Sequence, residues 1–254
     1  MQQSLFENTQ LDLPQKPALD IYRVGGCPYF DFYNSDNMEI MKQYPDNHFD
    51  IAIVDPPYGI GISKTKKSAA RKKNNYLTIY ETKEWDNKIP GDDYFIELFR
   101  VSKNQIIWGG NYFKLPLSKG WIFWDKEFSP EFSFAAGELA WTSFDVALKK
   151  FTFGYWKNKN NVSNNNKIAQ QFIRIHPTQK PEDLYSWIIQ NYAQPNFKIL
   201  DTHLGSASIA IAVHKANVLD KMNLHLTGIE IDADYFQAAM NRIKKHVAQT
   251  TLKF

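Results

Sequence analysis

The chain has one cysteine, no long apolar run and no marked excess of either charge sign. Because Cys27 is the single cysteine among 254 residues, no intrachain disulfide can form and a four-thiolate metal site is excluded. The apolar run 51–54 is far shorter than the ~20 residues that a membrane-spanning helix needs. The N-terminus has neither a basic start nor an apolar stretch of signal-peptide length. These absences predict a cytoplasmic protein with no membrane span, and we expect no metal.

Basic residues are segregated along the chain, although 30 basic against 27 acidic residues give a net charge of only +3. Residues 63–73 and 147–181 contain basic residues and no Asp or Glu, and the second stretch also carries Phe151, Tyr155 and Trp156. A basic run alone is typical of a solvated surface loop, whereas interleaved basic and aromatic residues suit a polyanion with stackable bases. Nucleic-acid contacts are therefore expected from Lys64, Lys66, Lys67, Arg71, Lys149, Lys150, Lys157, Lys159 and Arg174.

Hydrophobic residues make up 43% of the sequence, enough to form the core of a single domain over residues 1–254. Short runs rich in β-branched and aromatic residues predict strands at 49–54, 105–108, 121–124, 139–142, 198–200 and 225–229. Apolar residues at helical spacing predict helices at 93–101, 181–192, 206–215 and 233–246. This alternation predicts an α/β fold with a mostly parallel sheet and helices on both faces. In such folds, ligands bind beyond the carboxyl ends of the strands.

The turn Asp55-Pro56-Pro57-Tyr58 directly follows the strand predicted at 49–54. Prolines after a strand often do no more than begin a turn. They also fix φ and remove two backbone donors, so nearby carbonyls stay free to accept hydrogen bonds from another molecule. A rigid turn that holds a carboxylate and an aromatic ring beside such carbonyls suits a heterocyclic base with an exocyclic amine. All four residues are therefore candidate catalytic residues.

This turn resembles the catalytic motif of the S-adenosylmethionine-dependent DNA adenine-N6 methyltransferases, in which Asp-Pro-Pro-Tyr follows a core strand. The resemblance implies a Rossmann-like class I methyltransferase fold, S-adenosyl-L-methionine as cofactor and double-stranded DNA as substrate. Cytosine-N4 enzymes usually have Ser-Pro-Pro-Tyr instead, so Asp55 favours adenine. The resemblance also implies that Asp55 and the Pro56 carbonyl accept the hydrogens of the adenine amine, with Tyr58 stacking against a flipped base.

A second strand end, at 201–208, forms a glycine-containing turn before a predicted helix, and Glu230 follows the next predicted strand. Such a turn lets the backbone approach a ligand closely, and a carboxylate beyond the next strand can bind both hydroxyls of a ribose. One glycine turn alone is weak evidence. In this order, however, the turn and the acid are similar to the methyltransferase cofactor pocket, with Thr202-His203-Leu204-Gly205-Ser206-Ala207 in place of the usual Pro-Phe-x-Gly-x-Gly.

Two further segments match the family. His176-Pro177-Thr178-Gln179-Lys180-Pro181 is identical to its element at the methionine end of the cofactor, and residues 34–41 are similar to its adenosine-contacting stretch. The cofactor-binding residues that the resemblance implies are Asp36, Asp55, Thr178, Lys180, Asp201, Gly205, Ser206, Glu230 and Ile231.

The order of the motifs is that of the family's circularly permuted beta class, with the catalytic turn first. This order leaves a small insertion at 147–175 for recognition of the target sequence. Relatives of this class are often dimers, so a homodimer and a cognate restriction endonuclease are the protein partners to test. Methylation of cytosine N4, methylation of adenine in RNA, and a catalytically silent DNA-binding homologue stay open as alternatives.

Residues 109–111, Gly-Gly-Asn, follow the strand predicted at 105–108 and form a candidate edge of the site, but the sequence assigns them no role. The surrounding aromatic residues are expected in the core rather than at a substrate: Trp108, Tyr112, Phe113, Trp121 and Trp124.

Overall fold

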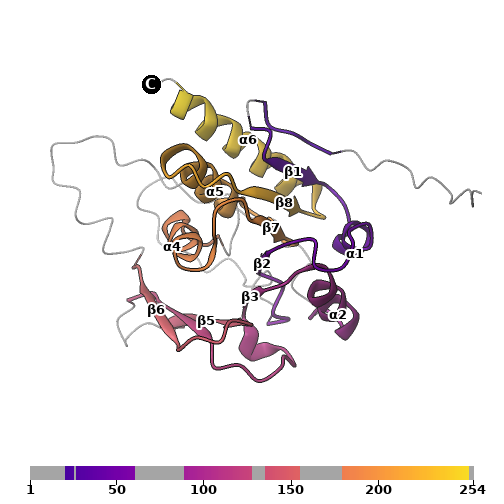
Figure 1. Cartoon of the computed structure of the whole chain (residues 1–254), viewed down its shortest axis with the longest axis vertical. Helices are drawn as coiled ribbons and strands as arrows, with labels where there is room; N and C mark the ends of the chain where they lie inside the picture. Colours follow the sequence, from indigo (N-terminus) through magenta and orange to yellow (C-terminus); the bar gives the residue numbers. More distant parts are fainter. Residues whose placement is uncertain (1–20, 26, 61–88, 128–134, 155–178, 252–254) are drawn as a thin grey trace, which may run out of the picture.

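The computed structural model describes residues 21–25, 27–60, 89–127, 135–154 and 179–251 (Figure 1). Within these residues, eight strands form one sheet in the order β1-β8-β7-β2-β3-β5-β4-β6. Neighbouring strands are parallel except where β5 runs antiparallel to β3 and β4. The strands are β1 (Phe30–Tyr33), β2 (Ile51–Val54), β3 (Gln105–Trp108), β4 (Trp121–Asp125), β5 (Gly137–Thr142), β6 (Lys149–Thr152), β7 (Lys198–Asp201) and β8 (His225–Ile229).

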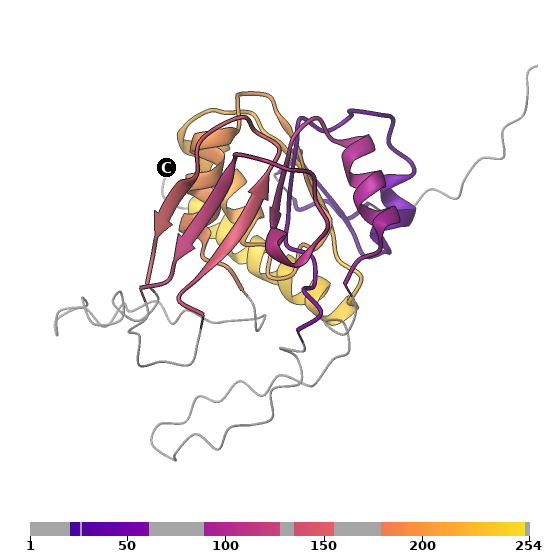
Figure 2. The same ribbon diagram turned by 90° about the horizontal axis from the view of Figure 1, so that it is seen from below.

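Helices cover both faces of this sheet (Figure 2). On one face lie α1 (Asn37–Met41) and α2 (Asp92–Val101). On the other lie α4 (Glu182–Tyr192), α5 (Ser208–Leu219) and α6 (Ala233–Thr251). Strand β2 explains why both faces need cover: Ile51 and Ile53 pack in the core beneath α4, α5 and α6, whereas Ala52 and Val54 pack with α1 and α2. The expected mostly parallel sheet with helices on both faces is confirmed.

Every predicted strand and helix is present, but some bounds and elements differ. The strand predicted at 49–54 begins at Ile51, and the helix predicted from residue 206 begins at Ser208 because Ala207 has a left-handed backbone, with φ of 56°. The sequence did not predict β1, α1 or β6, which are four or five residues long. Elements this short carry little periodicity, and β1 and β6 depend on pairing with β8 and β4.

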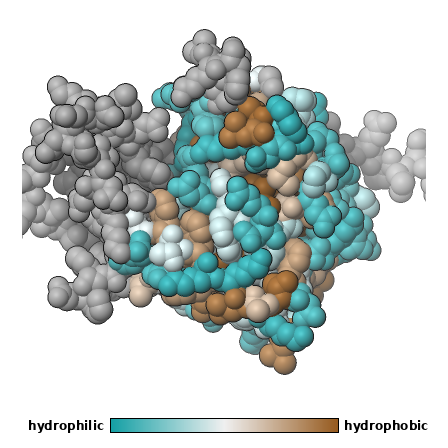
Figure 3. Space-filling view, turned by 60° about the vertical axis from the view of Figure 1, so that its left-hand side comes forward, coloured by the Kyte–Doolittle hydropathy of each residue, from teal (hydrophilic) through white to brown (hydrophobic). Residues whose placement is uncertain are grey.

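The face drawn in Figure 3 carries its hydrophobic residues in small areas among hydrophilic ones. No helix within the described part of the chain is long and apolar enough to cross a membrane. The buried apolar residues form two clusters, one on each face of the sheet.

Three adjacent parallel strands, β8, β7 and β2, end at the same edge of the sheet. Their carboxyl ends carry Glu230, Asp201 and Asp55, respectively. The topology therefore gathers three acidic residues that are far apart in the sequence.

Candidate active site

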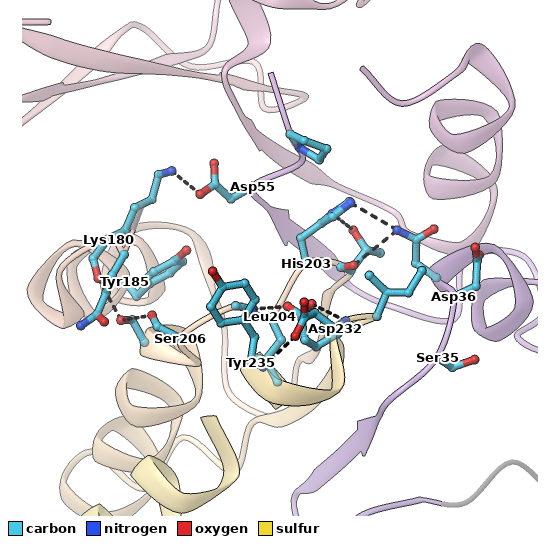
Figure 4. A pocket seen from close by; sticks show the side chains of 18 residues that line it. Ser35, Asp36, Asp55, Lys180, Tyr185, His203, Leu204, Ser206, Asp232 and Tyr235 are labelled. Carbon is cyan, nitrogen blue, oxygen red and sulfur yellow. Dashed lines mark hydrogen bonds and ion pairs between the residues drawn. The ribbon is translucent and has the colours of Figure 1, made fainter. Parts of the chain in front are cut away.

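A cavity of about 400 Å³ lies beyond the carboxyl ends of these strands (Figure 4). It is lined by Ser35, Asp36, Asn37, Asp55, Pro57, Gln179, Lys180, Tyr185, Thr202, His203, Leu204, Gly205, Ser206, Ser208, Glu230, Ile231, Asp232 and Tyr235. Most of the predicted cofactor-binding residues are therefore brought together. Asp201 does not line the cavity, and Thr178 lies outside the described residues.

Glu230 fastens the turn after β7 to the end of β8. Its Oε2 accepts from the backbone N–H of Gly205 at 2.8 Å, and its Oε1 accepts from that of Asp232 at 2.9 Å. The side chain is almost fully buried, and burial raises the pKa of its carboxyl group. A carboxylate has about four acceptor sites, so Glu230 keeps capacity for hydroxyl donors in the cavity.

The altered glycine turn keeps a backbone suited to close approach. Gly205 and Ala207 both have left-handed conformations, with φ of 49° and 56°. The second is a conformation that glycine adopts at lower cost, and it lies where the methyltransferase motif usually has its second glycine. The hydroxyl oxygens of Ser206 and Ser208 lie 3.2 Å apart and share a hydrogen bond. The Arg242 guanidinium donates to the Ser206 carbonyl. At Gly205 and Ser206 the turn therefore presents small residues to the cavity, beside the larger His203 and Leu204.

The two unusual residues of this turn, Thr202 and His203, belong to one chain of hydrogen bonds. His203 Nδ1 lies 2.9 Å from Thr202 Oγ1, which lies 2.7 Å from the hydroxyl of Tyr94 on α2. Asn37 Nδ2 lies 3.3 Å from His203 Nε2, on the other side of the ring. Burial lowers the pKa of His203 to about 4, so the ring is neutral at pH 7. A neutral ring that accepts from Asn37 at Nε2 donates from Nδ1 to Thr202.

Asp201 is 3% exposed and lies behind the cavity wall, where its Oδ1 accepts from the backbone N–H of His203 at 3.0 Å. Burial, together with the nearby negative charges of Asp55 and Glu230, raises the pKa of Asp201 to about 8. The residue therefore shapes the turn and carries a proton at neutral pH.

Both carboxylate oxygens of Asp55 are engaged. Oδ1 accepts from the hydroxyl of Tyr58 at 2.6 Å, and Oδ2 pairs with Lys180 Nζ at 2.5 Å (Figure 4). Lys180 Nζ also lies 3.2 Å from Glu138 Oε2. The ion pairs thus hold the carboxylate in one orientation at the edge of the cavity.

The ring of Tyr58 is held from two directions by residues whose roles the sequence did not indicate. Tyr112 stacks on it with ring centres 5.1 Å apart and planes 14° apart. A Cβ atom at Gly109, which has φ of 67°, would come within 2.2 Å of the Tyr58 ring. Tyr112 is 45% exposed, so the expectation that it lies in the core is wrong, whereas that expectation is confirmed for Trp108 and Trp124.

Two of the predicted DNA-contacting residues lie on the edge strand β6. Lys150 pairs with Asp125 at 2.7 Å, and Lys149 donates to Asn191 at 3.1 Å. The others lie outside the described residues: Lys64, Lys66, Lys67, Arg71, Lys157, Lys159 and Arg174.

Comparisons with known proteins identify similar sequences. Residues 137–241 match the model of a DNA methylase family that joins N6 and N4 methyltransferases. The chain is 24% identical to the type II methyltransferase M.BglII of Bacillus subtilis, over 82% of this chain and 67% of that protein. It is 23% identical to M.ScaI of Streptomyces caespitosus, over 89% and 86% of the two chains.

One solved structure supports the assignment of the fold, and a second is similar at a lower TM-score. PvuII DNA methyltransferase, a cytosine-N4-specific enzyme, aligns with a TM-score of 0.50 at 14% identity, covering 87% of this chain and 92% of that one. A complex of M1.HpyAVI with its SAM ligand aligns with a TM-score of 0.47 at 20% identity, covering 84% and 99%. The fold is therefore the Rossmann-like class I methyltransferase fold. The family match and the type II relatives support a DNA methyltransferase of the N6/N4 class that uses S-adenosylmethionine as cofactor.

The raised pKa of Asp201 predicts a dependence of stability on pH. The folded protein holds a proton on Asp201 up to about pH 8, whereas the unfolded chain loses it near the ordinary value of 3.8. The contribution of Asp201 to the unfolding free energy should therefore fall as pH rises, and Asp201→Asn should remove that contribution. Between pH 6.5 and 8 we expect the unfolding free energy of the wild type to fall by about 1–2 kcal/mol relative to that of Asp201→Asn.

Urea unfolding of both proteins at several pH values in this window measures the difference. Histidines whose pKa is lowered in the folded state, such as His203 and His246, also contribute to the pH dependence, but both proteins share this contribution and it cancels in the difference between them. Equal slopes in the two proteins would contradict the protonated state of Asp201.

Proposed function

We propose that this protein transfers a methyl group from S-adenosylmethionine to the N6 amine of a flipped adenine in double-stranded DNA. The observation that carries the proposal is the position of the Asp55-Pro56-Pro57-Tyr58 turn at the edge of a cavity that the glycine turn and Glu230 also line. Strands β2, β7 and β8 are neighbours in the sheet, which supports a site where the proposed catalytic and cofactor-binding residues act together.

The donor set of the cavity fits the cofactor. Glu230 can accept from ribose hydroxyls, and Gly205 and Ser206 allow close approach to the backbone. Asp36 also lines the cavity, although its carboxylate already accepts from the backbone N–H of Met38 at 2.7 Å. When bound, the cofactor supplies an electrophilic methyl group on a sulfonium cation, and the acidic lining formed by Asp36, Asp55, Glu230 and Asp232 suits a positive ligand.

Asp55 and the Pro56 carbonyl would accept the two hydrogens of the adenine amine. The nitrogen lone pair of that amine is delocalised into the ring, so two acceptors raise its electron density for attack. Positioning and electrostatics then account for most of the acceleration, without a covalent enzyme intermediate. Tyr58 offers its ring to the base, and a base that stacks on the face now covered by Tyr112 must displace Tyr112.

Several finer assignments belong to the same proposal. The chain order of Asp55, Lys180, Gly205 and Glu230 supports the permuted beta class, and Asp55 in place of serine supports adenine over cytosine N4. Residues 147–175 would recognise the target sequence, within a single domain over residues 1–254. The type II names of the relatives support a cognate restriction endonuclease as partner. A homodimer would follow only from the resemblance to the beta class, whose members are often dimers.

Methyl transfer with labelled S-adenosylmethionine to DNA and to RNA tests the function, with the modified nucleoside identified by mass spectrometry. N6-methyladenine in DNA is expected; N4-methylcytosine, or label in RNA alone, would replace the proposal with one of its alternatives. Asp55→Asn should abolish transfer and retain cofactor binding, because the amide keeps the shape and loses the carboxylate. A variant that transfers at the wild-type rate would remove Asp55 from catalysis.

Glu230→Ala should weaken cofactor binding by about 1–3 kcal/mol, or about 5- to 150-fold in Kd, because it removes the acceptor for the ribose and the anchor of Gly205. Isothermal titration calorimetry with S-adenosylmethionine measures the change. Glu97→Ala, on α2, serves as the control for loss of a partly buried carboxylate elsewhere. An unchanged Kd for Glu230→Ala would exclude the residue from the cofactor site.

Gly109→Ala should lower kcat on the order of 100-fold, because the new methyl group overlaps the Tyr58 ring and displaces it. The Kd for the cofactor should stay unchanged, since Gly109 does not line the cavity. Gly25→Ala is the matched control, because no atom lies within 4 Å of a Cβ there. Wild-type kcat in Gly109→Ala would show that the position of the Tyr58 ring is irrelevant to transfer.

A further inference from the structure

Four charged side chains, of which Asp55 is the first, are joined by ion pairs into one cluster. Lys180 Nζ lies 2.5 Å from Asp55 Oδ2 and 3.2 Å from Glu138 Oε2, and Lys126 Nζ lies 2.5 Å from Glu138 Oε1. The order of charges is therefore negative, positive, negative, positive, and their sum is zero. Glu138 lies on β5 and Lys126 directly follows β4, two strands that carry none of the motifs found in the sequence.

Lys180 is the central member of this cluster, with a side chain that is only 3% exposed. A buried ammonium is costly unless opposite charges surround it, and removal of one partner leaves the other charge uncompensated. The aromatic rings of Trp108 and Tyr58 lie 5.1 and 5.8 Å from Nζ and add a favourable contact. The Tyr58 hydroxyl lies 3.3 Å away. The three polar partners of Lys180 Nζ are therefore all protein groups: Asp55, Glu138 and the Tyr58 hydroxyl.

We propose that Glu138 is a positioning residue for methyl transfer, because it holds the Lys180 ammonium against Asp55 and thereby fixes the carboxylate that receives the substrate amine. This inference rests on the proposed function. Glu138 does not line the cavity, and its ion pair with Lys180 is its link to Asp55. With Oδ2 of Asp55 held by Lys180, Oδ1 is the oxygen left for the amine, in place of the Tyr58 hydroxyl that it now accepts from.

The ion pairs also decide the protonation of Lys180. Burial lowers the pKa of Lys180, but Asp55 and Glu138 outweigh it, and the net pKa is raised. The titratable and charged groups around it are Asp55 and Tyr58 after β2, Glu138 on β5, Lys126 after β4, Asp201 on β7 and Tyr185 on α4. Loss of the Glu138 charge removes one of two carboxylates that favour the ammonium, so the pKa of Lys180 should fall.

The test compares Glu138→Gln with the wild type over a range of pH. We expect kcat to fall on the order of tenfold, with an unchanged Kd for S-adenosylmethionine. The alkaline limb of the kcat profile should move to lower pH, because Lys180 loses its proton sooner. Glu138→Asp keeps the charge, so it should restore part of kcat and move the alkaline limb back toward its wild-type pH. The control is Glu97→Gln, whose carboxylate is 14% exposed and pairs with Arg100 at 2.7 Å away from the site.

Lys180→Met and the double variant Lys180→Met/Glu138→Gln show whether Glu138 acts through Lys180. The double variant should be no less active than Lys180→Met alone, and this comparison remains available where Glu138→Gln alone does not fold. A kcat for the double variant tenfold below that of Lys180→Met would overturn the inference. So would a Glu138→Gln variant whose kcat and alkaline limb match those of the wild type. Urea unfolding of the same variants measures the coupling between residues 138 and 180 without any assay of methyl transfer, and additive effects would likewise overturn it.

The two proposals fail in different ways. If the wild type transfers no methyl group to DNA, the proposed function is wrong, and the coupling measured by unfolding still tests the ion pair. If the wild type is active while Glu138→Gln keeps both its rate and its pH profile, only the positioning role is wrong.

Discussion

Repulsion between buried carboxylates is the constraint on which this site depends. Parallel strands β8, β7 and β2 end side by side and carry Glu230, Asp201 and Asp55 to one edge of the sheet. Each acid is compensated differently: Asp55 by the ammonium of Lys180, Glu230 by two backbone N–H groups, and Asp201 by a retained proton. Acids that are held in these ways can surround a cavity without forcing the strands apart.

Glu230 and Asp55 lie in different parts of the site. Glu230 and the turn at Gly205 form one wall, and Asp55 with Tyr58 forms the edge where a second ligand could approach. Under the proposed function, the first wall would hold the cofactor and the second would hold the base amine. Glu138 then extends the catalytic part of the molecule into β5, the strand that runs antiparallel to its neighbours.

The altered glycine turn shows how a departure from a motif is accommodated. Thr202 and His203 replace the usual proline and phenylalanine, yet their polar groups find partners in Tyr94 of α2 and Asn37 of α1. Ala207 keeps the left-handed backbone that a glycine would adopt more cheaply, and its methyl group is fully buried. The turn thus accommodates these side chains through hydrogen bonds to α1 and α2.

The sequence by itself determined the elements and motifs that local pattern encodes. The buried run at Ile51–Val54 and the turns that follow the strands predicted the sheet and its ligand-binding edge, because strand periodicity and turn chemistry are properties of neighbouring residues. The resemblance to the methyltransferase motifs implied part of the cavity lining. Tertiary structure alone decided the partners of those residues. Glu138 beside Lys180, Tyr112 upon Tyr58 and Asp201 behind the cavity wall depend on which strands lie next to each other, and strand order is set by contacts between segments distant in sequence.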